Sequence, residues 1–272
     1  MLEVKNVDVT YRSRRRHNDV LKDVSVTIEP GEAVAVIGES GSGKTTLART
    51  ILGVVKPRSG EILFEGRDLA GLRGTERSSF RRSGQLDYVF QDTLASLDPD
   101  VSAGNSAIEP LLVRSNTSKK DAVARARELF ETFGLSQSLF DKRPAQLSGG
   151  QRQRIGLIRA LIQQPKLLIL DEPLSALDAA NRAATIDLLV GLTQQGIALL
   201  LITHDIGSAV AVSQRTYVLW RGQIVEEAST WELIHDPEHD YSKLLVGSAG
   251  SLFSRGSSKE EREALRRRLE LA

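Results

Sequence analysis

A glycine-rich segment near the N-terminus carries the residue types and spacing of a phosphate site. It matches the pattern G-x-x-x-x-G-K-[ST] and consists of Gly38, Glu39, Ser40, Gly41, Ser42, Gly43, Lys44, Thr45 and Thr46. Glycines let the backbone approach a ligand, so N–H groups of the loop and of a following helix can converge on a β-phosphate. In such loops the lysine bridges the β- and γ-phosphates, and the next hydroxyl, here that of Thr45, ligates Mg²⁺. The segment predicts binding of ATP with Mg²⁺; the alternative is a glycine-rich turn that binds no nucleotide.

Two acidic residues, Asp171 and Glu172, directly follow the apolar segment 167–170. A buried strand that ends in acids places carboxylates at the carboxyl edge of a sheet, where open α/β sheets bind ligands. We expect Asp171 to hold Mg²⁺, through water, and Glu172 to polarise the attacking water as general base. The alternative is that the two acids only end a strand, and the phosphate loop in the same chain favours the catalytic interpretation.

A third motif, residues 147–154, is a small N–H-rich turn that opens a helix and forms a second anion site. With this motif the sequence resembles the nucleotide-binding subunits of ATP-binding cassette (ABC) transporters, and the resemblance covers about residues 1–247. It implies that two cassettes enclose two ATP molecules head to tail. Ser148, Gly149 and Gly150 of one subunit would then contact the γ-phosphate held by the other.

Four further positions take their roles from this resemblance. Tyr11 matches the aromatic residue that stacks on adenine, although a single tyrosine is also an ordinary core or surface residue. Gln91 matches the glutamine that reaches Mg²⁺ and the attacking water. Asp178 matches the loop that crosses the dimer interface, and His204 the histidine that contacts the γ-phosphate; a lone histidine after a strand is usually structural. No catalytic position departs from the family pattern, so both composite sites of a self-paired dimer should be competent.

Segments 90–99, 108–111, 141–146 and 235–245 resemble the ATPases of peptide and nickel importers. The chain resembles the shorter, second ATPase of such a pair, with peptides, nickel or metal–chelator complexes as family substrates. The resemblance implies a second ABC ATPase, two polytopic permease subunits and an extracytoplasmic substrate-binding protein as partners. It also implies a peripheral place on the cytoplasmic face of a bacterial inner membrane.

Two alternatives remain open at this point. An ABC-type nucleotide-binding subunit of a soluble metabolic complex, such as one for phosphonate breakdown, would keep the same motifs. His235 and His239 have the i, i+4 spacing of metal ligands on a helix, but Pro237 between them disfavours a regular helix.

Composition narrows the class of protein. The 272 residues include 36 Lys and Arg against 35 Asp and Glu, a net charge of +1 that gives no drive toward nucleic acid. The chain has no cysteine, which excludes a disulfide framework and a cysteine-bound zinc or iron–sulfur site. We expect neither a signal peptide nor a membrane span, so any spanning helices would come from another chain.

The elements that must position these residues are read from apolar periodicity. The expected strands cover residues 2–11, 20–28, 33–37, 61–64, 86–90, 167–170, 198–203, 216–220 and 223–226; the expected helices cover 45–52, part of 67–84, 119–133, 148–162 and 179–195. The basic segment 12–19 is expected to be a solvated hairpin tip or, alternatively, a patch facing lipid or a partner.

Strands that alternate with helices predict an α/β fold with a mostly parallel core sheet. In the terms of the resemblance, this is a P-loop NTPase of the ABC cassette type. We expect an N-terminal antiparallel β-subdomain and an inserted α-helical subdomain of about 92–160 within a cassette of 1–247. A charged C-terminal tail, 248–272, should follow.

Overall fold

The computed structural model describes residues 1–13, 16–90, 97–115, 117–175, 177–249, 263–265 and 267–269. The chain forms two compact units. Unit 1 combines Met1–Leu72 with Leu200–Ala272, and unit 2 is Arg73–Leu199. The expected helical segment of about 92–160 falls inside unit 2, and the expected cassette and tail boundaries stay predictions.

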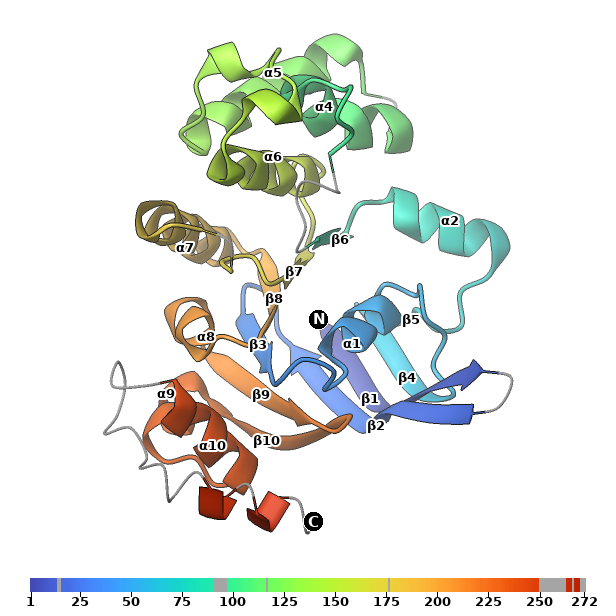
Figure 1. Ribbon diagram of the computed structural model, residues 1–272. Coiled ribbons are helices and arrows are strands. Elements are labelled where there is room, and N and C mark those ends of the chain that lie inside the picture. Colours follow the sequence, from blue (N-terminus) through green and yellow to red (C-terminus); the bar gives the residue numbers. More distant parts are fainter. Residues whose placement is uncertain are drawn as a thin grey trace. The chain divides into compact units, whose positions relative to one another are not determined.

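An antiparallel sheet of four strands opens unit 1, in the order β2-β1-β4-β5 (Figure 1). Its strands are β1 (Leu2–Ser13), β2 (Arg16–Ile28), β4 (Ser59–Phe64) and β5 (Arg67–Asp68). The register shifts between Val4 and Val7, where Asn6 adopts a φ of 47°. This irregularity lets both valines reach the core, because without it residues three apart would face opposite sides of the strand.

The expected hairpin over residues 12–19 forms, but its paired strands extend further into this segment than expected. Ser13 pairs with Arg16 and Arg12 with His17, so β1 and β2 continue almost to their connection, whose residues 14 and 15 lie outside the described part. The hydrogen bonds between the two strands are made by backbone groups, so the paired strands can extend through a segment whose side chains are polar.

Three strands of unit 1 carry the phosphate loop and the elements around it. The buried β3 (Ala33–Ile37) runs parallel to β9 (Arg215–Trp220), and β10 (Gln223–Ser229) is antiparallel to β9. The helices of unit 1 are α1 (Lys44–Ile51), α8 (Ile206–Val212), α9 (Thr230–His235) and α10 (Asp240–Ser248). These strands, and helix α1, agree with the expected ranges within about three residues.

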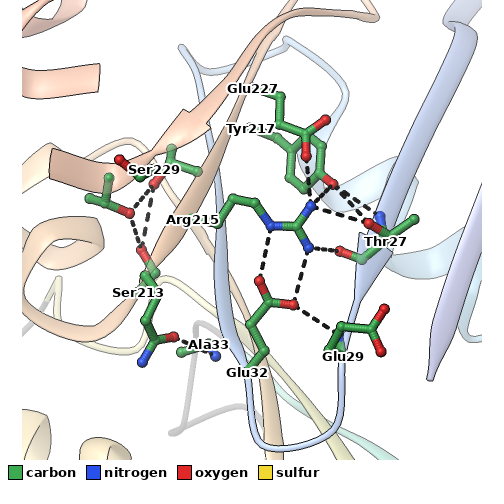
Figure 2. A network of polar contacts seen from close by, with 12 residues as sticks. Thr27, Glu29, Glu32, Ala33, Ser213, Arg215, Tyr217, Glu227 and Ser229 are labelled. Atoms are coloured by element: carbon green, nitrogen blue, oxygen red, sulfur yellow. Dashed lines mark hydrogen bonds and ion pairs between the residues drawn. The ribbon is translucent and has the colours of Figure 1, made fainter. Parts of the chain in front are cut away.

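A polar network centred on Arg215 ties the two sheets of unit 1 together (Figure 2). The guanidinium donates from Nε to Glu32 Oε1 at 2.9 Å and from Nη2 to Glu32 Oε2 at 3.1 Å. It also donates to Glu227 at 2.6 Å, to the backbone oxygen of Thr27 at 2.9 Å and to the hydroxyl of Tyr217 at 2.8 Å. The hydrogen bond to Glu32 is the main cause that raises the pKa of Arg215. Through these hydrogen bonds the guanidinium joins β2, β9, β10 and the turn before β3.

Unit 2 contains a helical group and the strands that carry the acidic residues. Its elements are α2 (Gly74–Arg82), β6 (Leu86–Val89), α4 (Ala103–Arg114), α5 (Lys119–Thr132), the 3₁₀ turns η1 (Gln137–Leu139) and η2 (Pro144–Gln146), α6 (Gly149–Leu161), β7 (Leu167–Asp171) and α7 (Ala179–Gln194). Strand β8 (Ala198–Thr203) crosses from unit 2 into unit 1. Helices α4, α5 and α6 form the helical group (Figure 1). Phe130 of α5 packs against Phe140, which follows η1, with ring centroids 5.3 Å apart.

The sequence predicts that the strand 86–90 is buried and that the helix 119–133 buries a stripe of Val123, Ala126, Leu129, Phe130 and Phe133; both expectations need correction. Strand β6 is half-buried rather than buried, and Phe90 beyond its end is 59% exposed. In α5 the buried face includes Ala122 with Ala126 and Phe130, whereas Val123 and Leu129 are only half-buried. The apolar stripe is therefore rotated slightly from the one read from the sequence. No helix in the described ranges has the length and apolar character needed to cross a membrane.

Candidate functional site

The phosphate loop joins β3 to α1, as the sequence predicts. Gly43 has a φ of 113°, and a Cβ there would lie 2.8 Å from Leu21 Cδ2 and 3.0 Å from the carbonyl oxygen of Val20. Only glycine fits both that conformation and that close approach to β2. The loop is closed by hydrogen bonds from the N–H of Ser42 to Glu39 O, at 3.2 Å, and from the N–H of Gly222 to Ser42 O, at 3.0 Å.

Lys44 is held within this loop. Its ammonium donates to the carbonyl oxygens of Gly38, at 2.6 Å, and Glu39, at 2.8 Å, and the residue is 8% exposed. Thr45 and Thr46 follow it in the first turn of α1 and are half-buried. A lysine and helical N–H groups thus gather around one loop, an arrangement that suits a phosphate group.

Asp171 and Glu172 end the fully buried β7. The hydroxyl of Tyr88, on the neighbouring parallel β6, donates to Asp171 Oδ2 at 2.6 Å and orients this carboxylate. Glu172 lies in the left-handed region, with a φ of 50° and 9% exposure. Its carbonyl oxygen accepts hydrogen bonds from the N–H and hydroxyl of Ser175, at 3.3 and 3.0 Å. The sequence did not predict the role of Tyr88 or the bend at Glu172.

The carboxylate of Asp171 and the hydroxyl of Thr45 are the type of ligand that Mg²⁺ takes. This ion prefers oxygen ligands and usually combines one or two carboxylates with waters and substrate phosphates. Within the described part of the chain, no group of three or more His, Asp and Glu side chains forms a metal cage.

The turn that opens the third motif, residues 148–150, is called the signature turn here, and it caps the N-terminus of α6. Ser148 Oγ accepts from the N–H of Gln151 at 3.2 Å, and Gln151 Oε1 accepts from the N–H of Ser148 at 2.9 Å. This reciprocal capping box fixes the first turn of the helix. Ser148 and Gly149 are exposed to solvent, whereas Gly150 is buried.

Asn181 connects the signature helix to the loop that carries Asp178, a link that the sequence did not reveal. A Cβ on Gly150 would lie 2.8 Å from Asn181 Cγ. Arg154 donates to Asn181 Oδ1 at 3.0 Å, and Asn181 Nδ2 donates to Asp178 Oδ2 at 2.6 Å. Asp178 also caps α7 by accepting from the N–H of Asn181 at 2.9 Å, and these hydrogen bonds lower the pKa of Asp178.

Two of the other expected site residues, His204 and Tyr11, lie in unit 1. His204 is exposed after β8, just before Asp205, which caps α8 by accepting from the N–H of Gly207 at 3.0 Å. Tyr11, on β1, is 41% exposed. Gln91 lies outside the described residues. The structure thus brings together the residues of the phosphate loop in unit 1. In unit 2 it groups Asp171 with Tyr88, and the signature turn with Asp178.

A family model described as ABC transporter matches residues 21–175, more than half of the chain. A putative peptide import ATP-binding protein of Brucella ovis is 37% identical over 267 residues, which cover 98% of this chain and 83% of the relative. The glutathione import ATP-binding protein GsiA of Shigella flexneri is 41% identical over 234 residues, 86% of this chain but 37% of that longer protein.

Solved structures show the same fold. A dimeric ATP-binding cassette in a post-hydrolysis state, with ADP and phosphate bound, superimposes with a TM-score of 0.77 at 31% identity, covering 85% of this chain and 99% of the other. A cassette from Clostridium perfringens, part of an ABC transporter complex, gives a TM-score of 0.76 at 27% identity over 88% of this chain and 92% of its own.

Proposed function

Because this chain belongs to the ABC transporter ATP-binding family, we propose that it is the ATP-hydrolysing subunit of a bacterial importer for peptides. The observation that supports this most strongly is the phosphate loop. Lys44 donates hydrogen bonds to two carbonyl oxygens of this loop, and α1 begins directly after it. The names of the relatives mention peptides and glutathione, so peptides are preferred here over nickel.

The residues of each cassette divide the work of binding and hydrolysis. The loop N–H groups and Lys44 bind the β- and γ-phosphates, and Tyr11 offers its ring to adenine. Thr45, Asp171 and Gln91 would hold Mg²⁺, and the ion would supply positive charge that offsets the charge of the phosphate oxygens. Glu172 accepts a proton from the attacking water, and His204 contacts the γ-phosphate.

A second ABC ATPase completes each site. Ser148, Gly149 and Gly150 of one subunit would contact the γ-phosphate held by the other, with Asp178 at the dimer interface. These contacts exist only in the closed dimer, so ATP binds that state better and drives closure. A monomer should bind ATP but hydrolyse it poorly. Two polytopic permeases on the cytoplasmic face of the inner membrane would receive the movement, and an extracytoplasmic binding protein would deliver the substrate.

The substitution Glu172→Gln tests the catalytic assignment. We expect hydrolysis by the assembled dimer of cassettes to fall by about 10²- to 10⁴-fold, the usual contribution of a general base, while ATP binding persists. The matched control is Glu128→Gln, which neutralises an exposed carboxylate on α5 of the same unit and should leave hydrolysis unchanged. Unchanged hydrolysis in Glu172→Gln would disprove the assignment.

Co-purification tests the partners. Two polytopic membrane proteins that accompany the chain would support the importer, and soluble enzyme subunits in their place would refute it in favour of a metabolic complex.

A further inference from the structure

The C-terminal helix α10 is hydrogen-bonded to the phosphate loop. The hydroxyl of Tyr241, in the first turn of α10, accepts a hydrogen bond from the backbone N–H of Glu39 at 2.8 Å. Tyr241 is only 1% exposed, and burial raises the pKa of its phenol to about 12, so the hydroxyl is uncharged at neutral pH. The contact joins residues that lie 202 positions apart in the sequence.

Several independent contacts fix the position of Tyr241. Its ring packs against Trp220 of β9, with centroids 5.6 Å apart and an interplanar angle of 30°. Its backbone N–H donates to His239 Nδ1 at 3.1 Å, which caps α10. The N–H groups of Glu238 and His239 donate to the carboxylate of Glu226 on β10, at 2.9 and 2.8 Å. The start of α10 is therefore anchored to β9 and β10 as well as to the phosphate loop.

The tyrosine holds a peptide group that also contacts the lysine of the loop. Between Gly38 and Glu39, the carbonyl oxygen of the peptide accepts from Lys44 Nζ at 2.6 Å, and the N–H of the same peptide donates to Tyr241. A peptide group is planar, so fixing its N–H also fixes the direction of its carbonyl. The hydroxyl of Tyr241 thereby sets one of the two carbonyl contacts of Lys44.

We propose that Tyr241 is a positioning residue for the phosphate loop, and that through the Gly38–Glu39 peptide it keeps the loop in the conformation that binds nucleotide. The inference rests on the proposed function, in which this loop binds ATP. The hydroxyl itself touches no phosphate; it raises the fraction of molecules whose loop is already competent. Since the apparent dissociation constant equals the intrinsic constant divided by that fraction, losing the hydroxyl weakens binding without removing any ligand contact.

The test compares Tyr241→Phe with Tyr217→Phe in the full chain. Both tyrosines are buried, and the hydroxyl of Tyr217 accepts from the N–H of Thr27 at 3.1 Å and from Arg215, away from the phosphate loop. Affinity for ADP with Mg²⁺ is measured by isothermal titration calorimetry, and stability by thermal unfolding. We expect Tyr241→Phe to raise Kd by about three- to tenfold, the worth of one ordinary hydrogen bond, and Tyr217→Phe to leave Kd within about 1.5-fold.

Two results would overturn the proposal: an unchanged Kd in Tyr241→Phe, or an equal increase in both variants, which would mark a general loss of packing. Failure of the wild-type chain to bind ADP would instead refute the proposed function. If Tyr241→Phe does not fold, hydrogen exchange of the Glu39 amide in the wild-type chain decides. Protection supports the contact, and exchange at the rate of an open loop rejects it.

Discussion

The contact between Gly150 and Asn181 leads to a prediction in which the effect of one substitution changes sign. In the wild-type chain, an alanine Cβ at position 150 would lie 2.8 Å from Asn181 Cγ and 2.9 Å from its Oδ1. The asparagine would have to move, because such distances are shorter than real Cβ contacts. Moving it breaks its hydrogen bond from Arg154, a side chain whose Nε is buried without a hydrogen-bond partner.

The magnitude follows from two opposing terms. Gly→Ala in a helix contributes up to about 1 kcal/mol of stability, because alanine loses less conformational freedom on folding. Losing a hydrogen bond from a part-buried guanidinium costs about 1.5–3 kcal/mol. We therefore expect Gly150→Ala to destabilise unit 2 by about 0.5–3 kcal/mol. In an Asn181→Ala background the steric conflict disappears, and the same Gly150→Ala change should stabilise by up to about 1 kcal/mol.

Urea unfolding of the four chains, followed by far-UV circular dichroism, measures this cycle. The predicted result is a lower midpoint for Gly150→Ala alone and a higher midpoint for the double variant than for Asn181→Ala. A destabilisation of equal size in both backgrounds would show that Asn181 does not limit the space at Gly150. Stabilisation in both backgrounds would show that the asparagine moves at no cost, and either outcome would refute the reasoning.

Two further predictions concern charged groups. Arg215→Lys replaces the two hydrogen bonds of the guanidinium to Glu32, and several others, by the contacts of one ammonium. It should lower the free energy of unfolding, measured by chemical denaturation, by about 1–3 kcal/mol. A difference below about 0.5 kcal/mol would show that the network contributes little to stability. Burial raises the pKa of Asp87 despite its ion pair with Arg114, at 3.2 Å. Above the pKa of the folded state, the charged carboxylate therefore lowers the free energy of unfolding. This penalty fades as the pH falls toward the pKa of the unfolded state. Asp87→Asn should therefore raise the urea midpoint at pH 7 and lose that advantage near pH 4, whereas a pH-independent difference would show that charge burial is not the cause.

The sequence predicted elements best where burial alone decides their limits. Strands β3, β7 and β8 are continuous apolar runs bounded by turns or charges, and their ranges agree with the expected ones within one residue. The hairpin of β1 and β2 was expected, but its strands extend further than their side chains indicate, because the backbone ladder continues where the residues are polar. The half-buried β6 was misread because one apolar strand pattern fits several degrees of burial.

Motif spacing also predicted a phosphate loop between a strand and a helix, where β3 and α1 now lie, but not the contacts that hold the expected site residues in place. Tyr88 reaches Asp171 across 83 positions, and Arg154 reaches Asn181 across 27. Such contacts depend on which strands and helices become neighbours, and the local helix or strand propensity of a segment does not determine this. A tyrosine or an asparagine in an ordinary stretch of sequence gives no signal that its polar group supports a site.

The positions of these supporting residues suggest a division within the chain. The phosphate loop and the signature turn lie inside the span that matches the family model, residues 21–175. Tyr241, which holds the first, and Asn181, which packs against the second, both lie after that span. Changes at Tyr241 and Asn181 can therefore alter nucleotide affinity or stability without touching the phosphate loop or the signature turn. Two expected site residues, Asp178 and His204, also lie after residue 175, so the division concerns these supporting contacts and not all of the site. Variants of Tyr241 and Asn181 should shift Kd and stability by small factors, whereas Glu172→Gln should lower hydrolysis by about 10²- to 10⁴-fold.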